Sequence, residues 1–472
     1  MKDAPFEWDA VPAQGEIFLS RKRMVVMSDF QVAYIPIGVP TFHLESAQKE
    51  FEKSIQMLRG LSEDVVCPKE MLLSIDALQE FLSEISPDLI VLQNITFANA
   101  AYPSEVLRRF DCPVLLWTLR EPVIDGGRLR LNSLTGAYSA GNAIRAFRDG
   151  AFEYVFGGPS EAQVIETVAG CMKAARVKKQ MRGLKIASIG HTPQGFGFGR
   201  ALDLELMTKF GVELESIEAR ELIEKAKSYT AEECRSYLDE AEEKMVGLSS
   251  VNADNVEGFS RLYKAYKDYV LENQIGAISS RCWPDFFTSF GTPVCAVLAL
   301  LNDMKIAASC EADTYGALSM YIGMQLTDEC VFFGDPVSMD EEENTVTYWH
   351  CGTAACSLAR RDTGACVGLH CNRKIGPTME FGCRAAERVT VFRVGKDGDG
   401  AFRFFVASGQ ALDKEKQFNG TSVVVRTDNP AKDLVYQSVK DGWEPHFVVV
   451  YGDVAAELAM LGHMLGIEVV NY

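Results

Sequence analysis

Short apolar runs separated by segments of helical period make up the first part of the chain. Strands are predicted at residues 24–30, 88–94 and 112–119, which read MVVMSDF, DLIVLQN and CPVLLWTL. Between the first two, the segment 44–61 places Phe51 and Leu58 on one apolar stripe, as in an amphipathic helix. Strands that alternate with helices of this length predict a parallel sheet, and hence an α/β domain over residues 1–183.

The same alternation resumes over residues 184–330. Strands are predicted at residues 185–190 and 212–218, and two long polar helices at 219–248 and 256–273. The run 305–310 consists mostly of small and apolar residues without Pro or Gly, which suits one buried strand. Apolar residues then recur at helical spacing at Leu318, Ile322 and Leu326. This pattern predicts a second α/β domain whose last strand leads directly into a helix.

The pattern changes near Val331, where helical periodicity fades and Gly, Thr, Val and aromatic residues become frequent. Alternating or apolar runs occur at residues 345–350, 388–394, 402–409, 422–427 and 447–452. A helix at 454–465 and a strand at 467–472 close the chain. These features predict an antiparallel β-barrel domain over residues 331–472. The predicted fold class is therefore α/β, with two parallel-sheet domains followed by a C-terminal antiparallel β-barrel.

Composition is typical of a soluble globular protein with several domains. The 472 residues are too many for one core, and 47% hydrophobic with 24% charged residues is an ordinary balance. No apolar run approaches the about 20 residues of a membrane span, and the first residues lack the pattern of a secretion signal. The odd number of cysteines, 13, indicates reduced thiols. We therefore expect a cytoplasmic protein.

The net charge narrows the class of partner. The formal charge is −18 at pH 7. Binding to nucleic acid requires a basic face, and an anionic membrane surface attracts basic segments, so both kinds of partner are disfavoured. We expect no nucleic acid and no membrane partner, and a small molecule as ligand.

Two carboxylates follow the strand predicted at 305–310. Glu311 and Asp313 are two apart, so on an extended backbone they project from the same face. They lie where a parallel strand gives way to a helix, which is where open α/β sheets bind ligands. Hard divalent cations take carboxylate oxygens, so the pair can be interpreted as a metal site. The alternative is an exposed helix N-terminus, where acidic side chains complement the helix dipole.

Histidines add candidate ligands. The chain has six of them. His350 closes the strand-like TVTYWH and His446 precedes the strand-like FVVVYG, so imidazoles at strand ends are available to join the carboxylates. His191 follows a predicted strand, and His370 lies in the β domain. Either could face a substrate.

Cysteines near two of these histidines suggest a different kind of metal site. They occur at positions 351, 356, 366, 371 and 383, and His350-Cys351 is matched by His370-Cys371. A structural zinc site typically draws on closely spaced CxxC pairs, and this segment has none. Buried free thiols are the favoured interpretation.

A glycine-rich loop follows the strand predicted at 185–190. Gly195, Gly197 and Gly199 partly match the dinucleotide-binding fingerprint, but Arg200 stands where its third glycine would be. Acidic residues do occur about 20 residues further on, as in that fingerprint. A nicotinamide-dependent oxidoreductase is therefore one alternative function. A loop that closes over a substrate, or merely turns sharply, explains the glycines as well.

Several motifs together resemble the L-fucose isomerase and L-arabinose isomerase superfamily, and more narrowly its shorter fucose/arabinose isomerase-like members. They are RCWPDF at 281–286, CEADxxGALSM at 310–320, HCGTA at 350–354 and PHFVVVYGD at 445–453. The resemblance implies two Rossmann-like α/β domains, a C-terminal β-barrel, and trimers or hexamers with active sites between subunits. It also implies interconversion of aldoses and ketoses that depends on Mn²⁺ or another divalent cation.

The resemblance implies roles for individual residues. Glu311 and Asp313 match the acidic Glu-x-Asp segment of the family. His350 resembles a metal-binding histidine of arabinose isomerases, and His446 the C-terminal histidine of both branches. A further acidic ligand is expected upstream, where Asp285 is the carboxylate between residues 281 and 299. We therefore expect Glu311, Asp313, His350 and His446 to bind the metal, with Glu311, Asp313 and Asp285 as catalytic candidates.

The chemistry and the substrate follow from this resemblance. Moving a carbonyl from C1 to C2 requires a base that removes a proton from C2 and a group that returns one to C1, and a divalent cation stabilises the enediolate charge. Trp283 could pack against a sugar ring. Arg281 could bind the anionic group of a hexose such as sulfoquinovose, since bidentate arginine suits sulfonate and phosphate. Neutral fucose-like or arabinose-like sugars are the alternative substrates, and a non-catalytic sugar-binding protein is the alternative function.

Overall fold

The structure is a computed structural model that describes residues 30–148 and 152–472. The strand predicted at 24–30 lies, apart from Phe30, outside the described residues. The first described strand, β1 (Val32–Ile37), comes directly after that position. The helix predicted at 44–61 is confirmed as α1 (Leu44–Leu61).

The first sheet is parallel, as predicted. Its strands are β1, β2 (Val65–Val66), β3 (Leu89–Asn94), β4 (Val114–Thr118) and β5 (Glu153–Phe156), in the order β2-β1-β3-β4-β5. Its helices are α1, α2 (Ile75–Ser83), α3 (Ala101–Arg109), α4 (Ser133–Phe147) and α5 (Ala162–Met181). Helices α1 and α5 pack on one face and α2, α3 and α4 on the other. Because both faces are covered, β1, β3 and β4 are buried along their whole length.

The second sheet is also parallel. Its strands are β6 (Lys185–Ile189), β7 (Glu213–Ile217), β8 (Ala277–Ser280) and β9 (Ala307–Cys310), in the order β7-β6-β8-β9. Its helices are α6 (Asp203–Phe210), α7 (Ala219–Ser228), α8 (Arg235–Lys244), α9 (Ala253–Glu272), α10 (Cys295–Asp303) and α11 (Thr314–Thr327). The single helix predicted at 219–248 is wrong, because the chain leaves helical geometry at Tyr229 and starts again at Arg235.

The C-terminal part contains an eight-stranded sheet in the order β14-β17-β11-β10-β18-β15-β16-β19. These strands are β10 (Phe332–Asp340), β11 (Thr345–His350), β14 (Phe381–Gly382), β15 (Ala386–Lys396), β16 (Phe402–Ala411), β17 (Thr421–Thr427), β18 (Phe447–Val450) and β19 (Glu468–Asn471). β12 (Val367–Gly368) and β13 (Thr378–Met379) pair separately, while α12 (Ala431–Lys440) and α13 (Ala455–Leu465) complete this part. The purely antiparallel arrangement is wrong, since β14 with β17 and β16 with β19 pair in parallel.

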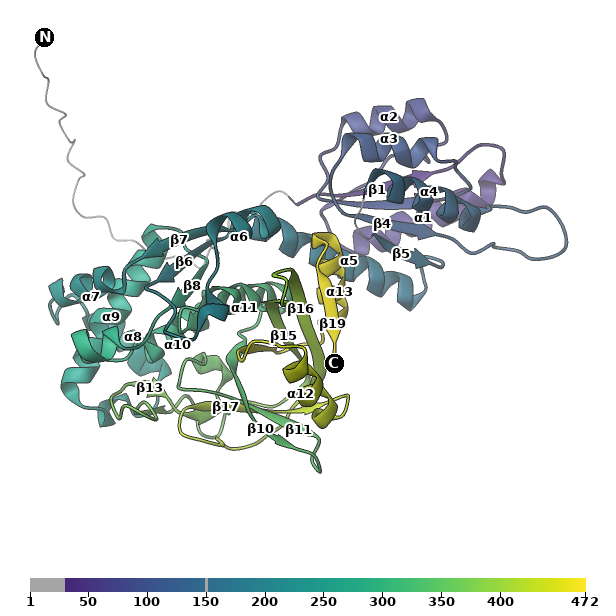
Figure 1. Ribbon diagram of the computed structural model, residues 1–472. Helices are drawn as coiled ribbons and strands as arrows, with labels where there is room; N and C mark the ends of the chain where they lie inside the picture. Colours follow the sequence, from purple (N-terminus) through teal and green to yellow (C-terminus); the bar gives the residue numbers. More distant parts are fainter. Residues whose placement is uncertain (1–29, 149–151) are drawn as a thin grey trace, which may run out of the picture.

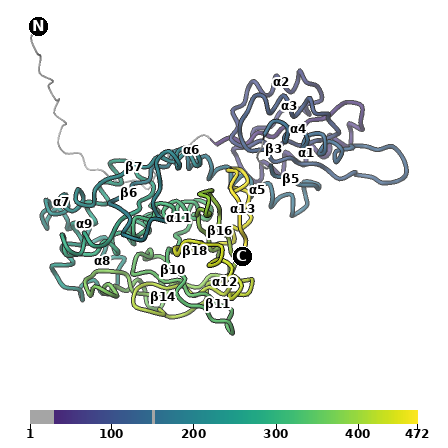
Figure 2. The backbone as a smooth tube through the Cα atoms, in the orientation of Figure 1, coloured from purple at the N-terminus to yellow at the C-terminus, as the bar shows by residue number. Residues whose placement is uncertain are grey.

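The first sheet and its helices form a lobe set apart from the rest of the chain (Figure 1). Helix α5 leads out of this lobe and lies along α13, as the backbone trace also shows (Figure 2). The ion pair between Lys173 and Glu457, 3.4 Å long, and the contact between the sulfur atoms of Cys171 and Met460 connect the two helices. The C-terminal helix therefore anchors the lobe to the body of the molecule.

Helix α11 lies between the second parallel sheet and the eight-stranded sheet. Nearly all its residues are buried, and the hydrophobic core runs without interruption from one sheet to the other. The Ser319 hydroxyl of α11 accepts a hydrogen bond of 2.8 Å from the Val394 backbone in β15. The turn from β9 into α11 is thus held at the junction of the two sheets.

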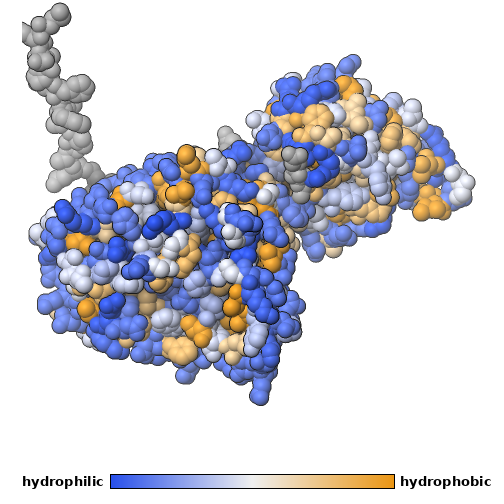
Figure 3. Space-filling model, viewed as in Figure 1, coloured by the Kyte–Doolittle hydropathy of each residue, from blue (hydrophilic) through white to orange (hydrophobic). Residues whose placement is uncertain are grey.

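The exterior is largely hydrophilic on the face shown in Figure 3, with scattered apolar residues. Among the described helices, none combines the length and the apolar character that crossing a bilayer requires. All 13 cysteines fall within the described ranges, and each is a free thiol.

Candidate active site

The segment between β9 and α11 carries the two predicted carboxylates. Glu311 and Ala312 both have left-handed backbone conformations, with φ of 58° and 54°. For non-glycine residues this costs about 1–2 kcal/mol each, which the buried surroundings must offset. The premise of an extended backbone is therefore wrong. The left-handed pair turns the chain sharply, so that Asp313 becomes the N-cap of α11 and accepts the Gly316 N–H at 2.8 Å.

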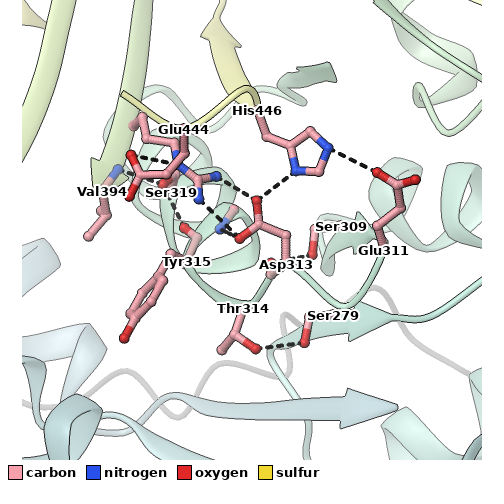
Figure 4. Close-up of polar contacts among 12 residues, drawn as sticks. Ser279, Ser309, Glu311, Asp313, Thr314, Tyr315, Ser319, Val394, Glu444 and His446 are labelled. Atoms are coloured by element: carbon pink, nitrogen blue, oxygen red, sulfur yellow. Dashed lines mark hydrogen bonds and ion pairs between the residues drawn. The ribbon is translucent and has the colours of Figure 1, made fainter. Parts of the chain in front are cut away.

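The two carboxylates meet at one imidazole, that of His446 (Figure 4). Asp313 Oδ2 lies 2.8 Å from Nδ1, and Glu311 Oε2 lies 3.0 Å from Nε2. His446 immediately precedes β18 and is 1% exposed. Burial lowers its pKa, but hydrogen bonds to Asp313 and Glu311 outweigh that effect and leave the pKa raised. The structure therefore joins the two sheets through the residues that the sequence singled out.

Both carboxylate oxygens of Asp313 accept hydrogen bonds from groups within the protein. Arg393 of β15 donates to its two carboxylate oxygens at 2.5 and 3.2 Å, and His446 and the N–H of Gly316 use the same oxygens. Neither charged partner is exposed to solvent. Burial raises the pKa of Asp313, but the Arg393 charge and the His446 contact hold it well below its ordinary value. Asp313 is thus an ionised carboxylate whose oxygens all have donors.

Asp335 is a third carboxylate at His446 and was not among the residues predicted from the sequence. Its Oδ1 lies 3.5 Å from Nε2 of His446. Asp335 lies in β10, which pairs with β11 on one side and with β18 on the other. β11 ends at His350, and β18 begins directly after His446. Burial raises the pKa of Asp335 despite the nearby imidazoles. A charge inside the apolar run CVFFGDPV was the signal available in the sequence.

His350 completes the cluster from the end of β11. Donor atoms of Glu311, His350 and His446 lie within 4.8 Å of one another, close enough to share one metal ion. Carboxylates and imidazoles are donors that suit Mn²⁺ and similar divalent cations. Asp335 extends this donor set, because it reaches the same nitrogen of His446 as Glu311 does.

Aromatic rings enclose the imidazoles. Phe333 lies 4.7 Å from the His446 ring and 5.4 Å from the His350 ring, while Phe198 lies 5.3 Å from His446. Phe198 belongs to the glycine-rich loop. A Cβ added at Gly199 would stand only 2.8 Å from the Asp313 Cα, so glycine is required for this close approach. The loop thus walls the candidate site with an apolar side chain.

The other predicted site residues lie in three places. Asp285 forms an ion pair of 2.9 Å with Arg281, whose Nε also donates to the Trp283 carbonyl. His370 is buried and packs edge-on against Phe287 at 5.0 Å. Within the described residues, none of these four predicted residues belongs to the donor cluster of Glu311, His350 and His446.

His191 is exposed and lines a cavity of about 300 Å³ at the carboxyl ends of β6 and β7. The cavity also contains Arg200 and reaches Ala312 and Thr314, which flank Asp313. Arg200 donates a hydrogen bond of 3.2 Å to the Thr192 hydroxyl. A cavity lined by the cationic Arg200 and by the carboxylates of Glu218 and Glu221 therefore borders the turn that carries the acidic cluster.

Known proteins resemble this chain over nearly its whole length. Residues 365–472 match the model of the L-fucose isomerase C-terminal domain. The chain is 65% identical over 446 residues to a sulfoquinovose isomerase of Clostridium sp. (strain MSTE9), covering 94% of this chain and all of that protein. It is 39% identical over 450 residues to sulfoquinovose isomerases of Priestia aryabhattai and Priestia megaterium (strain ATCC 12872 / QMB1551), with 94% of this chain and all of each relative covered. The chain is a sugar isomerase and belongs to the fucose/arabinose isomerase-like family that includes these proteins.

Proposed function

We propose that this enzyme interconverts the aldose and ketose forms of the sulfonated hexose sulfoquinovose, with the help of a divalent cation. The observation that carries the proposal is the group of Glu311, Asp335, His350 and His446, which comes from both sheets and centres on one imidazole nitrogen. The relatives named sulfoquinovose isomerase, which cover nearly the whole chain, support the substrate.

The donor chemistry supports a cation at this position. Asp313 is ionised and faces Nδ1 of His446, so Nδ1 holds a proton, and once Nε2 loses its own proton its lone pair is directed at Glu311 and Asp335. Two carboxylate oxygens at Nε2 require positive charge there, which a proton on the imidazole supplies in the metal-free protein and a cation would supply in its place. We therefore propose Glu311, Asp335, His350 and His446 as ligands of Mn²⁺ or a similar ion.

Asp313 takes a different role in this proposal from the one predicted. Its oxygens are occupied by Arg393, Gly316 and His446, which leaves no lone pair free to bind a cation. We infer that it is a positioning residue that fixes the tautomer and the orientation of His446. Such partners of a metal-binding histidine typically alter metal affinity when they are changed.

The isomerisation requires a proton to leave C2 and one to reach C1. A bound divalent cation would supply Lewis-acid stabilisation of the negative charge that develops on O1 and O2. Asp335 and Glu311, which both reach Nε2 of His446, are the carboxylates placed to take up and return these protons. The rings of Phe198 and Phe333 exclude water from the reacting atoms.

For the sulfonate group we propose Arg200, in the cavity next to Ala312 and Thr314. A guanidinium can donate two parallel hydrogen bonds to a sulfonate. The predicted Arg281 is a weaker candidate, because it is already paired with Asp285.

Further features of the molecule belong to the same proposal. We propose domains at 1–183, 184–330 and 331–472, since each range contains its own sheet. The pairing of β16 with both β15 and β17 supports closure of the last sheet into a barrel. The free thiols support a cytoplasmic location. A homo-oligomer with active sites between subunits, trimeric or hexameric, rests on the family resemblance.

The test is an assay of the purified enzyme after chelation and after addition of Mn²⁺, with sulfoquinovose, L-fucose and L-arabinose as substrates. We expect turnover of sulfoquinovose that is lost on chelation and restored by Mn²⁺. Arg200→Gln should raise KM for sulfoquinovose by about tenfold, because it removes one charged hydrogen bond to the sulfonate. Arg220→Gln, at an exposed position of α7, is the control and should leave KM unchanged. Turnover that survives complete metal removal, or equal turnover of the neutral sugars, would contradict the proposal.

A further inference from the structure

A group of sulfur and nitrogen donors lies next to the acidic cluster. Donor atoms of Cys295, Cys351 and His370 are within 4.8 Å of one another, and so are those of Cys310, His350 and Cys351. Cys295 begins α10, Cys310 ends β9 and Cys351 follows β11, so packing rather than sequence proximity unites them. Cys295 and Cys310 are completely buried, while Cys351 keeps some exposure.

This group differs from the acidic cluster in the kind of ion it suits. Thiolate sulfur with imidazole nitrogen is the donor set of Zn²⁺ and similar borderline or soft cations, whereas the acidic cluster offers mainly carboxylate oxygens. Zn–S bonds of about 2.3 Å separate tetrahedral ligands by about 3.8 Å. Donor atoms within 4.8 Å therefore need to approach by only about 1 Å.

We propose that Cys295, Cys351 and His370 bind a borderline or soft divalent cation, represented by Zn²⁺. Cys310, whose sulfur lies within 4.8 Å of the Cys351 sulfur but in a separate donor group from Cys295 and His370, would supply a fourth thiolate by moving toward Cys351. The site, here called the thiol site, differs from the sequence-based interpretation, which favoured buried free thiols over a zinc site among neighbouring cysteines. Cys356, Cys366 and Cys383 take no part in the donor groups of the described residues. Cys351 and His370 do take part, but with Cys295 from α10 and Cys310 from β9.

The thiol site shares two backbone junctions with the acidic cluster. Cys310 is followed directly by Glu311, and His350 directly by Cys351, so each junction contributes one donor to each site. Drawing the two sulfur atoms together moves both junctions. We therefore infer that filling the thiol site displaces Glu311 and His350 and weakens binding of the catalytic cation, an inference that rests on the proposed function.

The binding itself can be tested without any activity measurement. The full-length protein, loaded with Mn²⁺, is titrated with Co²⁺, which gives a sulfur-to-cobalt charge-transfer band when thiolates bind it. We expect the band to saturate at one equivalent, to disappear in Cys295→Ser and to fall in His370→Gln. Cys234→Ser is the matched control, because this cysteine is equally buried but lies at the start of α8.

The outcomes are distinct. Absence of the band in the wild-type protein overturns the thiol site, as does a band that persists in a folded Cys295→Ser variant. If Cys295→Ser does not fold, the wild-type titration and His370→Gln still decide. Glu311→Gln should keep the band, which separates the thiol site from the acidic cluster.

Coupling between the sites is measured by activation with Mn²⁺ in the presence of one equivalent of Zn²⁺. We expect an apparent affinity for Mn²⁺ about tenfold weaker in the wild type, as when partners of metal ligands are perturbed, and unchanged in Cys295→Ser. An affinity that does not change when the thiol site is filled refutes the coupling. Failure of the isomerase proposal would leave the optical result standing.

Discussion

The two halves of the candidate active site are built in different ways. The second parallel sheet contributes Glu311 and Asp313 from a single turn, in which two left-handed residues are followed by a helix cap. The eight-stranded sheet contributes Asp335, His350 and His446 from positions that only strand pairing brings together. The backbone conformation of one turn thus places the donors from the second parallel sheet, whereas the register of strand pairing places the donors from the eight-stranded sheet. Because the cluster needs donors from both sheets, the packing of α11 between them is part of the site.

The largest expected loss of activity follows when either half of the candidate active site loses its central donor. Glu311→Gln removes a charge from the first half, and His446→Gln removes the imidazole from the second. Each should lower kcat/KM for sulfoquinovose by roughly 10³-fold with the fold intact, since metal binding and proton transfer both depend on the cluster. Steady-state kinetics with saturating Mn²⁺ and circular dichroism provide the measurement. Near-normal turnover in either variant would disconnect that half from the chemistry.

Variants of Asp335 and Asp285 test which aspartate takes part in the chemistry. Asp335 is the one that lies near His446, and Asp285 is the one that the family resemblance implied. Asp335→Asn should reduce kcat by about 10²–10³-fold, because this carboxylate reaches His446 and is proposed to carry a proton. Asp285→Asn is the matched control and should change kcat far less, since Asp285 pairs with Arg281 instead. The reverse order of effects would restore Asp285 as the upstream acidic ligand and remove Asp335 from the mechanism.

An Asp313 variant tests how much the contact between the two halves of the site contributes to the free energy of unfolding. Asp313→Asn leaves the buried Arg393 charge without its carboxylate partner and should lower the free energy of unfolding by about 3–5 kcal/mol. Glu341→Gln breaks the exposed ion pair with Lys432 and should cost about 0–1 kcal/mol. Urea denaturation compares the two variants. A loss as small as that of the control would show that the buried pair does not hold the sheets together.

The glycine-rich loop allows a finer comparison within one half. Gly199→Ala forces a Cβ to 2.8 Å from the Asp313 backbone and should cost about 1–3 kcal/mol of stability, with lower activity. A Cβ at Gly197 meets no atom within 4 Å, so Gly197→Ala should be nearly neutral. Thermal unfolding and the isomerase assay are the measurements. Equal behaviour of the two alanine variants would show that the loop does not press on Asp313.

The smallest expected effect is on the pH dependence of stability in the metal-free protein. The folded pKa of His446 is raised, so its stabilising contribution is fully present below the ordinary value of about 6.5 and is lost as pH rises through the folded pKa. Stability should therefore decline above about pH 6.5, and His446→Gln should flatten that decline. Mn²⁺ should do the same in the wild type, because the cation replaces the proton. An unchanged pH profile in the variant would remove His446 as the titrating group.

Much of the local structure was predictable because it depends on neighbouring residues. The apolar stripe of residues 44–61 predicts α1 with its observed bounds, and the buried run before Glu311 predicts β9. The break between α7 and α8 was missed, because residues 229–234 (YTAEEC) contain no Gly or Pro that would interrupt the helical pattern. The resemblance of RCWPDF, CEAD and PHFVVVYGD to known isomerases identified the family, and the relatives confirm it.

Pattern and motif alone pointed to an acidic turn and two imidazoles in a sugar isomerase, because the spacing of apolar residues and the presence of strand-end histidines are properties of short segments. Packing decided the rest. Asp335 joins His446 because β10 pairs with β18, Asp313 is engaged because Arg393 reaches it from β15, and the thiols of Cys295 and Cys351 meet although they are distant in the chain. Contacts of this kind depend on strand register and on the fit between two sheets, which no short stretch of residues specifies.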